Sequence, residues 1–222
     1  ALRVGGEGKG QVQLGPGKPR VSLLLRVWAR ENGCRNRGQG PGGKAALMGA
    51  LARIESAHVD AVEVSPHRAK LIEKTVQGLP VTVHVADGRN PQVGSGFDRI
   101  LVDAPCSGLG ALRRRPEARW RKSEDDIAEL STLQFELLSS ALKLVRPGGV
   151  VVYSTCSPDL RETRAIVDQA VEKLGAQELD AREFIPDMGN VGKEKSVQMW
   201  PHRHGTDAMF MAVLRRGDEE GR

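Results

Sequence analysis

The chain has 222 residues, of which 39% are hydrophobic and 27% charged, a balance that predicts one α/β domain with a modest extension. Its formal net charge of +5 is compatible with an anionic partner but does not require one. No apolar stretch approaches the roughly 18 residues of a membrane span, residues 1–20 lack the apolar block of a signal peptide, and the three cysteines show no zinc-site spacing. We therefore expect a cytoplasmic protein with free thiols and no metal.

The first half of the chain opens with few periodic residues and then alternates strand and helix patterns. Residues 1–20 predict a loose leader before a folded domain at 21–216, and residues 217–222 a polar tail. The apolar run at 21–30 precedes a polar, glycine-rich stretch, and helical spacing begins after Gly43. A buried strand is expected at 58–64 and a helix at 66–76.

The second half continues this alternation. Strands are expected at 81–85, 97–102, 150–153 and 207–214. Helices are expected from Ser123 to the Pro-Gly-Gly turn at 147–149, and from about 161 to 174. This order predicts a Rossmann-like α/β fold: a central, mostly parallel sheet with helices on both faces and an antiparallel strand near Phe210.

Five polar or reactive side chains each follow an apolar strand: Glu63, Asp87, Asp103, Cys106 and Cys156. In open α/β sheets, ligands bind beyond the carboxyl ends of the strands. The sequence therefore predicts that these side chains lie together at one edge of the sheet and form a site.

Three of the early features favour an adenosyl ligand when they are taken together. The loop of Gly40, Pro41, Gly42, Gly43 and Lys44 could bring backbone N–H groups to a ligand, or could be a plain turn. Glu63 stands where nucleotide-binding folds place a ribose-binding carboxylate, although a surface acid at a helix start is the alternative. Asp87 could accept from an adenine amino group or cap a loop.

The two later cysteines suit chemistry on a pyrimidine. A thiolate that adds at C6 converts the ring into an enamine whose C5 can attack a methyl donor. A carboxyl group such as that of Asp103 can stabilise charge near N3, and a second thiol or water can assist release. The alternatives for Cys106 and Cys156 are buried small apolar residues or a disulfide.

A basic segment follows Cys106 and carries six positive charges and one tryptophan. Its candidate RNA-binding residues are Arg113, Arg114, Arg115, Arg119, Trp120, Arg121 and Lys122. Arginines beside an aromatic side chain suit phosphates and a stacked base, whereas the alternative is a solvated face. His202 and His204 have no third ligand nearby in sequence, so no metal site is expected there.

Seven segments between Gly40 and Leu214 resemble the Sun/Fmu-type (RsmB-like) bacterial RNA cytosine-C5 methyltransferases, which are related to the eukaryotic NSUN enzymes. The matching segments are PGGK at 41–44, VEVSPHRAKL at 62–71, VADGR at 85–89, FDRILVDAPCSGLGALRRRPEARW at 97–120, LQ at 133–134, RPGGVVVYSTCSP at 146–158 and WPHRHGTDAMF at 200–210. The pair DAPCSG and STCS, about fifty residues apart, is the most specific of these.

The resemblance implies a class I S-adenosylmethionine-dependent methyltransferase domain that modifies C5 of cytosine in RNA. It implies that Cys156 is the nucleophile and that Cys106 helps release the product, whereas DNA cytosine methyltransferases attack with the cysteine of a PC motif. Asp103 would orient the cytosine and contact the methionine part of the cofactor. The remaining cofactor residues implied are the loop through Lys44, Glu63 at the ribose, the neighbouring Arg68, and Asp87 at the adenine. Small-subunit ribosomal RNA is the first expected substrate and transfer RNA the second.

The chain departs from the family pattern in two places. From the sequence we expect none of the N-terminal RNA-binding domains typical of this type, so the resemblance does not define the RNA target. The family also has an apolar strand before the cofactor loop, but residues 31–39 are strongly polar. Either the reading frame or the gene has degenerated locally, or the first strand has shifted upstream to 23–28. The rival function is an RNA-binding remnant that has lost cofactor binding, which gains if residues 31–40 cannot form the first strand and loop. A methyltransferase acting on nitrogen or oxygen is a third possibility, but such a reaction needs no thiolate.

Overall fold

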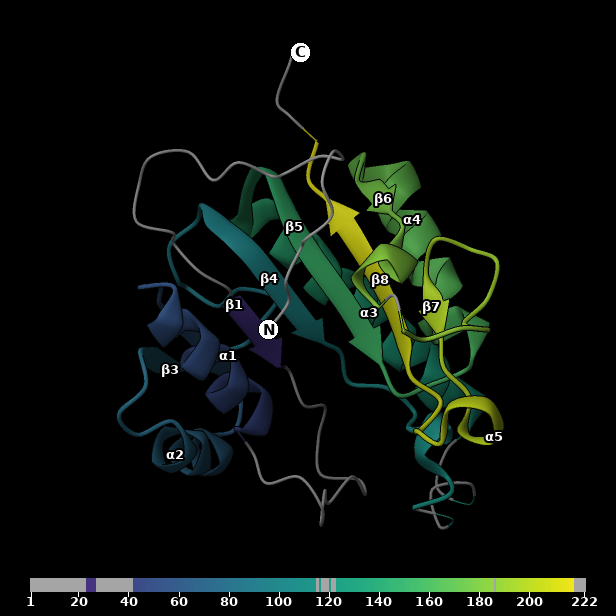
Figure 1. Ribbon diagram of the computed structural model, residues 1–222, viewed down its shortest axis with the longest axis horizontal. Helices are drawn as coiled ribbons and strands as arrows, with labels where there is room; N and C mark the ends of the chain where they lie inside the picture. The colour runs from purple at the N-terminus through teal and green to yellow at the C-terminus, as the bar shows by residue number, and fades with distance from the viewer. Residues whose placement is uncertain are drawn as a thin grey trace.

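The computed structural model describes residues 42–114, 116, 120, 123–185 and 187–217, together with the backbone of 23–26. Within this part of the chain, one eight-stranded twisted sheet carries helices on both faces (Figure 1). This confirms the Rossmann-like arrangement expected from the alternating strand and helix patterns.

The sheet is parallel in its first five strands and antiparallel where β8 joins it. The strands are β1 (Leu23–Arg26), β2 (Val59–Glu63), β3 (Val81–Val85), β4 (Phe97–Asp103), β5 (Val145–Thr155), β6 (Gln177–Leu179), β7 (Val197–Gln198) and β8 (Phe210–Arg215). Their order is β3-β2-β1-β4-β5-β8-β6, and β7 also pairs with β8. β8 runs antiparallel to β5, with Phe210 opposite Thr155, which confirms the antiparallel strand predicted near Phe210.

The helices cover both faces of the sheet. Neighbouring strand residues pack against different helices because their side chains point to opposite faces. The helices are α1 (Gly43–Ile54), α2 (Pro66–Thr75), α3 (Glu124–Leu144), α4 (Arg164–Leu174) and α5 (Pro201–His204), with short 3-10 turns η1 (Leu109–Ala111), η3 (Leu160–Glu162) and η4 (Ala181–Phe184). Ala61 and Leu101 pack with α1 and α2, whereas Val62, Val102 and Tyr153 pack with α3 and α4. Burying one large apolar side chain contributes about 1.5–3 kcal/mol to the free energy of folding, so the helix layers on both faces stabilise the sheet.

The start of α3 agrees with the sequence in detail. The Ser123 hydroxyl accepts a hydrogen bond from the Asp126 backbone N–H at 3.2 Å. In return, the Asp126 carboxylate accepts from the Ser123 backbone N–H at 2.8 Å. This reciprocal capping box fixes the first residue of the helix.

Three elements begin three or more residues away from their predicted starts. β5 begins at Val145 rather than 150, because the chain leaves α3 at Leu144 and pairs with β4 at once, through a register shift opposite Phe97 and Arg99. α4 begins at Arg164 rather than near 161, because η3 comes first and the Asp159 side chain accepts from the Arg161 N–H. β8 begins at Phe210 rather than 207.

The first strand lies in the upstream apolar run. β1 is inserted between β2 and β4 and is parallel to both, so it occupies the centre of the sheet. Of the two alternatives, this agrees with a first strand shifted upstream of the polar segment 31–39, although the strand covers 23–26 rather than 23–28. That polar segment itself lies outside the described residues, as do residues 1–20 and 218–222.

The parallel strands all direct their carboxyl ends to the same edge of the sheet. The arrowheads of β1, β4 and β5 point to one side in Figure 1, where the segment around α5 also lies. The polar residues that follow the strands therefore gather at this edge.

None of the described helices is both long and apolar enough to cross a bilayer.

Candidate active site

Cys106 and Cys156 face each other beyond the ends of two adjacent strands. β4 and β5 pair in register up to Asp103 and Ser154, and the Ala104 N–H then donates to the Ser154 carbonyl at 2.9 Å. This last contact keeps the two chain segments together as they leave the sheet. The two sulfur atoms lie 3.3 Å apart, and both cysteines are half-buried and free of disulfide bonds.

The two thiols are electrostatically unequal. The hydrogen bond with Cys156, together with burial, raises the pKa of Cys106 well above its ordinary value. The hydrogen bond from Cys106 lowers the pKa of Cys156; Lys44 also lowers it, while burial and the carboxylates of Asp103 and Asp207 oppose the shift. Either sulfur can donate at this distance, and the two pKa shifts correspond to the arrangement in which Cys106 keeps the proton and Cys156 carries negative charge more readily.

A buried polar network lies behind Cys106 and is centred on Glu162. Its carboxylate accepts from the Ser107 backbone N–H at 2.7 Å and from the Ser107 hydroxyl at 2.5 Å. The Gln134 amide donates to the same carboxylate at 3.1 Å and to the Pro105 carbonyl at 2.8 Å. The Tyr153 hydroxyl donates to the Glu162 backbone carbonyl at 2.7 Å. Because Glu162, Gln134 and Tyr153 are each 0% exposed, this network is rigidly enclosed.

Gly110 joins the Cys156 segment to the segment before β8. Its N–H donates to the Cys156 carbonyl at 3.0 Å, and its carbonyl accepts from the Ala208 N–H at 2.9 Å. A Cβ at this position would lie 2.8 Å from the Cys156 carbonyl oxygen and would also collide with the Ala208 carbonyl. Only glycine permits this close approach of three backbone segments.

Lys44 and Asp103 form an ion pair next to the sulfur atoms. Lys44 lies in the first turn of α1, and its Nζ is 2.5 Å from the Asp103 carboxylate at the end of β4. The preceding Gly42 has a φ of +106°, and a side chain there would lie 2.9 Å from the Cβ of Thr75. Gly43 begins the helix, whereas Gly40 and Pro41 lie outside the described residues. The described part of the predicted loop thus places its lysine at the same site as Asp103.

Glu63 is completely buried at the end of β2, with 0% of its surface exposed. Its two carboxylate oxygens accept from the Ser65 backbone N–H and from the Arg68 guanidinium, each at 3.1 Å. These contacts explain why an acid is tolerated inside the protein at this position. They also fix its orientation, while each oxygen can accept a further hydrogen bond.

Asp87 follows β3 and is more open. Its carboxylate is paired with Arg89 at 2.6 Å and also accepts from the Arg89 backbone N–H at 2.9 Å. The Arg89 side chain holds the pKa of Asp87 below its ordinary value, with burial opposing the shift. Arg89 also contacts Glu136 on α3 at 3.2 Å, so the carboxylate at position 87 is tied to the helix layer.

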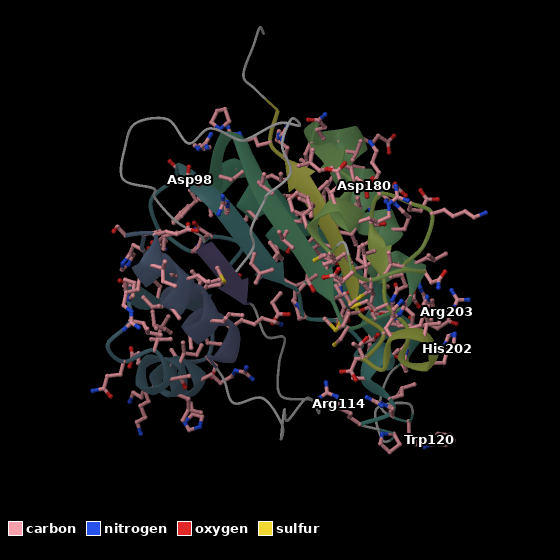
Figure 2. The ribbon with its side chains drawn as sticks, viewed as in Figure 1. Asp98, Arg114, Trp120, Asp180, His202 and Arg203 are labelled. Atoms are coloured by element: carbon pink, nitrogen blue, oxygen red, sulfur yellow. The ribbon has the colours of Figure 1, made fainter. Side chains whose placement is uncertain are left out.

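The predicted RNA-binding segment is only partly described, and its described arginines have partners within the protein. Arg113 donates to the Gly205 carbonyl at 3.2 Å, and Arg114 forms an ion pair with Asp207. Trp120 is 83% exposed, and Figure 2 places it with Arg114 at one end of the molecule, away from Asp98. The candidates that lie outside the described residues are Arg115, Arg119, Arg121 and Lys122.

His204 serves the local structure of α5. Its Nδ1 accepts from the Trp200 backbone N–H at 2.9 Å, and its Nε2 lies 3.0 Å from the Gly189 carbonyl. Both ring nitrogens are therefore occupied, while His202 lies on the outside of the molecule beside Arg203 (Figure 2). The described residues contain no group of three side chains that could hold a metal ion.

Sequence reasoning missed the network behind Cys106 and the glycine beside Cys156. Gln134 stands in the LQ pair that contributed to the resemblance, but as a polar residue on a helix it gave no sign of burial. Glu162 lies six residues after Cys156 and has the sequence context of an exposed helix-start acid. Gly110 follows the DAPCSG motif by two residues, and this position next to the motif was the only signal for it in the sequence.

Comparisons with known proteins agree with this geometry. A family model described as 16S rRNA methyltransferase RsmB/F matches residues 36–215. A putative methyltransferase of Mycobacterium tuberculosis is 56% identical over 178 residues, which cover 80% of this chain and 39% of that protein. Ribosomal RNA small subunit methyltransferase B of Vibrio cholerae is 37% identical over 179 residues, which cover 78% of this chain and 39% of that protein. The chain thus spans about two fifths of the length of these relatives.

The solved structures include one close in fold. NSun6 from Pyrococcus horikoshii with SFG has a TM-score of 0.73 and 27% identity, covering 90% of this chain and 48% of that chain. The fold is that of class I S-adenosylmethionine-dependent methyltransferases. With the family model matching most of its length, the chain belongs to the RsmB/F family of 16S rRNA methyltransferases.

Proposed function

We propose that this chain transfers a methyl group from S-adenosylmethionine to C5 of a cytosine in RNA, through a covalent bond between Cys156 and C6. The observation that carries the proposal is the pair of sulfur atoms 3.3 Å apart, of which Cys156 has the lowered pKa and Cys106 the raised one. Methylation of a nitrogen or oxygen atom requires no such pair, whereas addition to a pyrimidine C6 requires a thiolate.

The residues at this sheet edge fit S-adenosylmethionine. Gly42 allows the chain to turn tightly into α1, whose first N–H groups suit a carboxylate, so this loop and Lys44 would hold the methionine end. Glu63 would accept from the ribose hydroxyls, with Arg68 keeping its carboxylate oriented. Asp87 would lie at the adenine and Asp103 beside the methionine part. When bound, the cofactor supplies an electrophilic methyl group on a sulfonium centre.

The chain's own residues account for the bonds made and broken on the base. The Cys156 thiolate adds to C6, and the ring electrons move to C5, which then takes up the methyl group. The C5 proton leaves to water or a base, its electrons re-form the C5–C6 double bond, and the C6–S bond breaks toward Cys156. Cys106, whose S–H faces Cys156, stabilises the departing sulfur by hydrogen bonding. The base must be held out of its stack to reach the sulfur.

Asp103 is suited to hold the pyrimidine ring. It follows β4 three residues before Cys106, and its ion pair with Lys44 stabilises its negative charge. A carboxyl group in this position can contact N3 and the amino group of cytosine, where charge changes during addition at C6. The same contact would distinguish cytosine from uracil, which presents a different pattern of donors and acceptors.

The nucleic acid is proposed to be small-subunit ribosomal RNA, with transfer RNA second. The relative from Vibrio cholerae is named for the small ribosomal subunit, and the family model for 16S rRNA. On this chain, exposed Trp120, fourteen residues after Cys106 in sequence, offers a stacking surface. Arg114 is neutralised by Asp207 in the structure, so its contribution to phosphate binding requires exchange of that ion pair.

The test of the proposal is identification of the methylated nucleoside. Small-subunit ribosomal RNA transcribed without modifications is incubated with the chain and methyl-labelled cofactor, digested to nucleosides and separated. Label in 5-methylcytidine is the expected result. Label in any other nucleoside contradicts the proposed chemistry, while no label together with retained RNA binding favours the remnant interpretation.

Replacing Glu63 with glutamine is expected to weaken cofactor binding about tenfold or more. The variant keeps the side chain's size but loses the negative charge, and a hydrogen bond to a charged group contributes about 1.5–3 kcal/mol. Isothermal titration calorimetry with S-adenosylmethionine measures the change, and thermal melting checks that each protein is folded. Glu73→Gln, on the exposed surface of α2, is the matched control. Equal affinity of Glu63→Gln and the parent chain would refute this role for Glu63.

A further inference from the structure

Glu162 is a buried acid that takes no direct part in the bond changes proposed above. Its carboxylate accepts three hydrogen bonds, from the backbone N–H of Ser107, the hydroxyl of Ser107 and the amide of Gln134. These three donors fix the position of both carboxylate oxygens inside the protein. No lysine or arginine in the described part of the chain lies within ion-pair distance of this carboxylate, and the neighbouring Arg161, which pairs with Asp159, interacts with it electrostatically at longer range.

This network holds the residues on both sides of Cys106 in place through hydrogen bonds. Ser107, the next residue, is bound to the carboxylate through both its backbone and its hydroxyl group. Pro105, the preceding residue, is held through its carbonyl by Gln134, which also donates to Glu162. Because Ser107, Gln134 and Glu162 are all buried, this network holds the Cys106 sulfur 3.3 Å from Cys156.

The charge of Glu162 acts on Cys106 in the same direction. Hydrogen bonding to Cys156 is the largest cause of the raised pKa of Cys106, followed by burial and then by the charges of Cys156 and Glu162; only the Gly108 N–H opposes them. Tyr153 also faces this region and is kept neutral by burial. A negative charge at Cys106 would lie near the negative charge of Glu162 in a poorly solvated place, which is unfavourable.

The groups around Cys156 differ. Lys44 favours a negative charge there, while Asp103 and Asp207 disfavour it, and Arg114 lies close enough to interact with the sulfur. Glu162, in contrast, disfavours a negative charge on Cys106. The surroundings of the two cysteines thus differ: the buried acid Glu162 lies near Cys106, whereas Cys156 lies among both carboxylates and cations.

We propose that Glu162 is a positioning residue that fixes the 105–107 segment and keeps Cys106 in its thiol form, with the proton directed at Cys156, so that Cys156 is the reactive sulfur of the pair. The inference rests on the proposed function, because it explains how two neighbouring cysteines take unequal parts in one reaction. It concerns the chemistry of the thiols, which can be measured without RNA or cofactor.

The test is the pH dependence of Cys106 alkylation by iodoacetamide, followed by mass spectrometry of the peptide that contains it. The chain carries Cys156→Ser, so that Cys106 titrates without its thiol neighbour, and is compared with and without Glu162→Gln. Because alkylation follows the thiolate fraction, removing the negative charge is expected to move the pH midpoint down by about one unit, or tenfold in rate below the midpoint. An unchanged midpoint in a folded Glu162→Gln protein overturns the proposal.

Two further variants sharpen the test. Glu178→Gln removes a carboxylate that pairs with Arg164 on α4, and it should leave the Cys106 midpoint unchanged. Ser107→Ala removes one donor from Glu162 but keeps its charge, so the midpoint should rise. If Glu162→Gln does not fold, Ser107→Ala decides: a midpoint that fails to rise overturns the proposal. Since none of these measurements involves methyl transfer, their failure is distinct from failure of the proposed function.

Discussion

Replacing Cys156 with alanine is expected to reduce methyl transfer by roughly four orders of magnitude or more while leaving RNA affinity within about twofold. Without the thiolate, no bond forms at C6, and C5 of cytosine is too weak a nucleophile to take the methyl group. The measurement is incorporation of labelled methyl into RNA under single-turnover conditions, with RNA binding followed separately by filter retention. Cys156 accepts its hydrogen bond from Cys106 outside the Glu162 network, so the variant should remain folded.

The same variant can be tested for the covalent intermediate directly. In RNA that carries 5-fluorocytidine, the fluorine at C5 cannot leave as a cation, so an adduct once formed cannot complete the reaction. The parent chain should give a protein–RNA species that survives denaturing electrophoresis, and Cys156→Ala should give none. Cys34→Ala is the matched cysteine control and should form the adduct. Persistent methyl transfer by Cys156→Ala would show that the nucleophile is another group.

The position of the site was predictable because it depends on short-range patterns. Apolar strands followed by Glu63, Asp103 or Cys156 are visible in sequence, and parallel strands must end at a common edge. The structure brings the Cys106 and Cys156 sulfur atoms, which follow adjacent strands, to 3.3 Å. It also brings Lys44, in the first turn of α1, to Asp103 at the end of β4. The helix boundary at Ser123 was predictable for a similar reason, because a capping box lies within four residues.

The relations that were not predictable join residues far apart in the chain. Glu162 lies 55 residues from Ser107 and 28 from Gln134, and nothing in the local sequence of any of them indicates burial. The same holds for Arg114, which meets Asp207 93 residues away and so departs from the expectation of a free basic face. β5 began early because its pairing with β4 outweighed the turn-forming tendency of Pro-Gly-Gly. Hydrophobic periodicity in the sequence does not predict long-range polar contacts, because these are set by tertiary packing.

The upstream position of β1 bears on whether the chain can bind its cofactor. A central strand at 23–26 supplies the framework from which a loop can reach α1, although the segment between them is polar. The remnant interpretation gains if residues 31–40 cannot form the first strand and the cofactor loop, and those residues lie outside the described part of the chain. The backbone pairing of β1 with both β2 and β4 shows that a central strand forms upstream of them.

Replacing Cys106 with alanine is expected to trap the covalent complex on ordinary RNA, because release is impaired while Cys156 remains. Assistance by a positioned acid or hydrogen-bond donor typically contributes between a hundredfold and ten-thousandfold, so the adduct should persist for at least about a hundred times longer than in the parent chain. Denaturing electrophoresis with labelled RNA measures its amount and lifetime.

The variant should also change the pH dependence of attack. The hydrogen bond from Cys106 is the largest cause that lowers the pKa of Cys156, so its removal raises that pKa. At a given pH below the new value, a smaller fraction of Cys156 is thiolate, and the rate of adduct formation must shift to higher pH. Slower formation and much slower release together give an adduct that builds up most at alkaline pH. If Cys106→Ala forms no adduct at any pH while Cys156→Ala does, Cys106 is the nucleophile and the hydrogen bond between the sulfur atoms runs in the opposite direction.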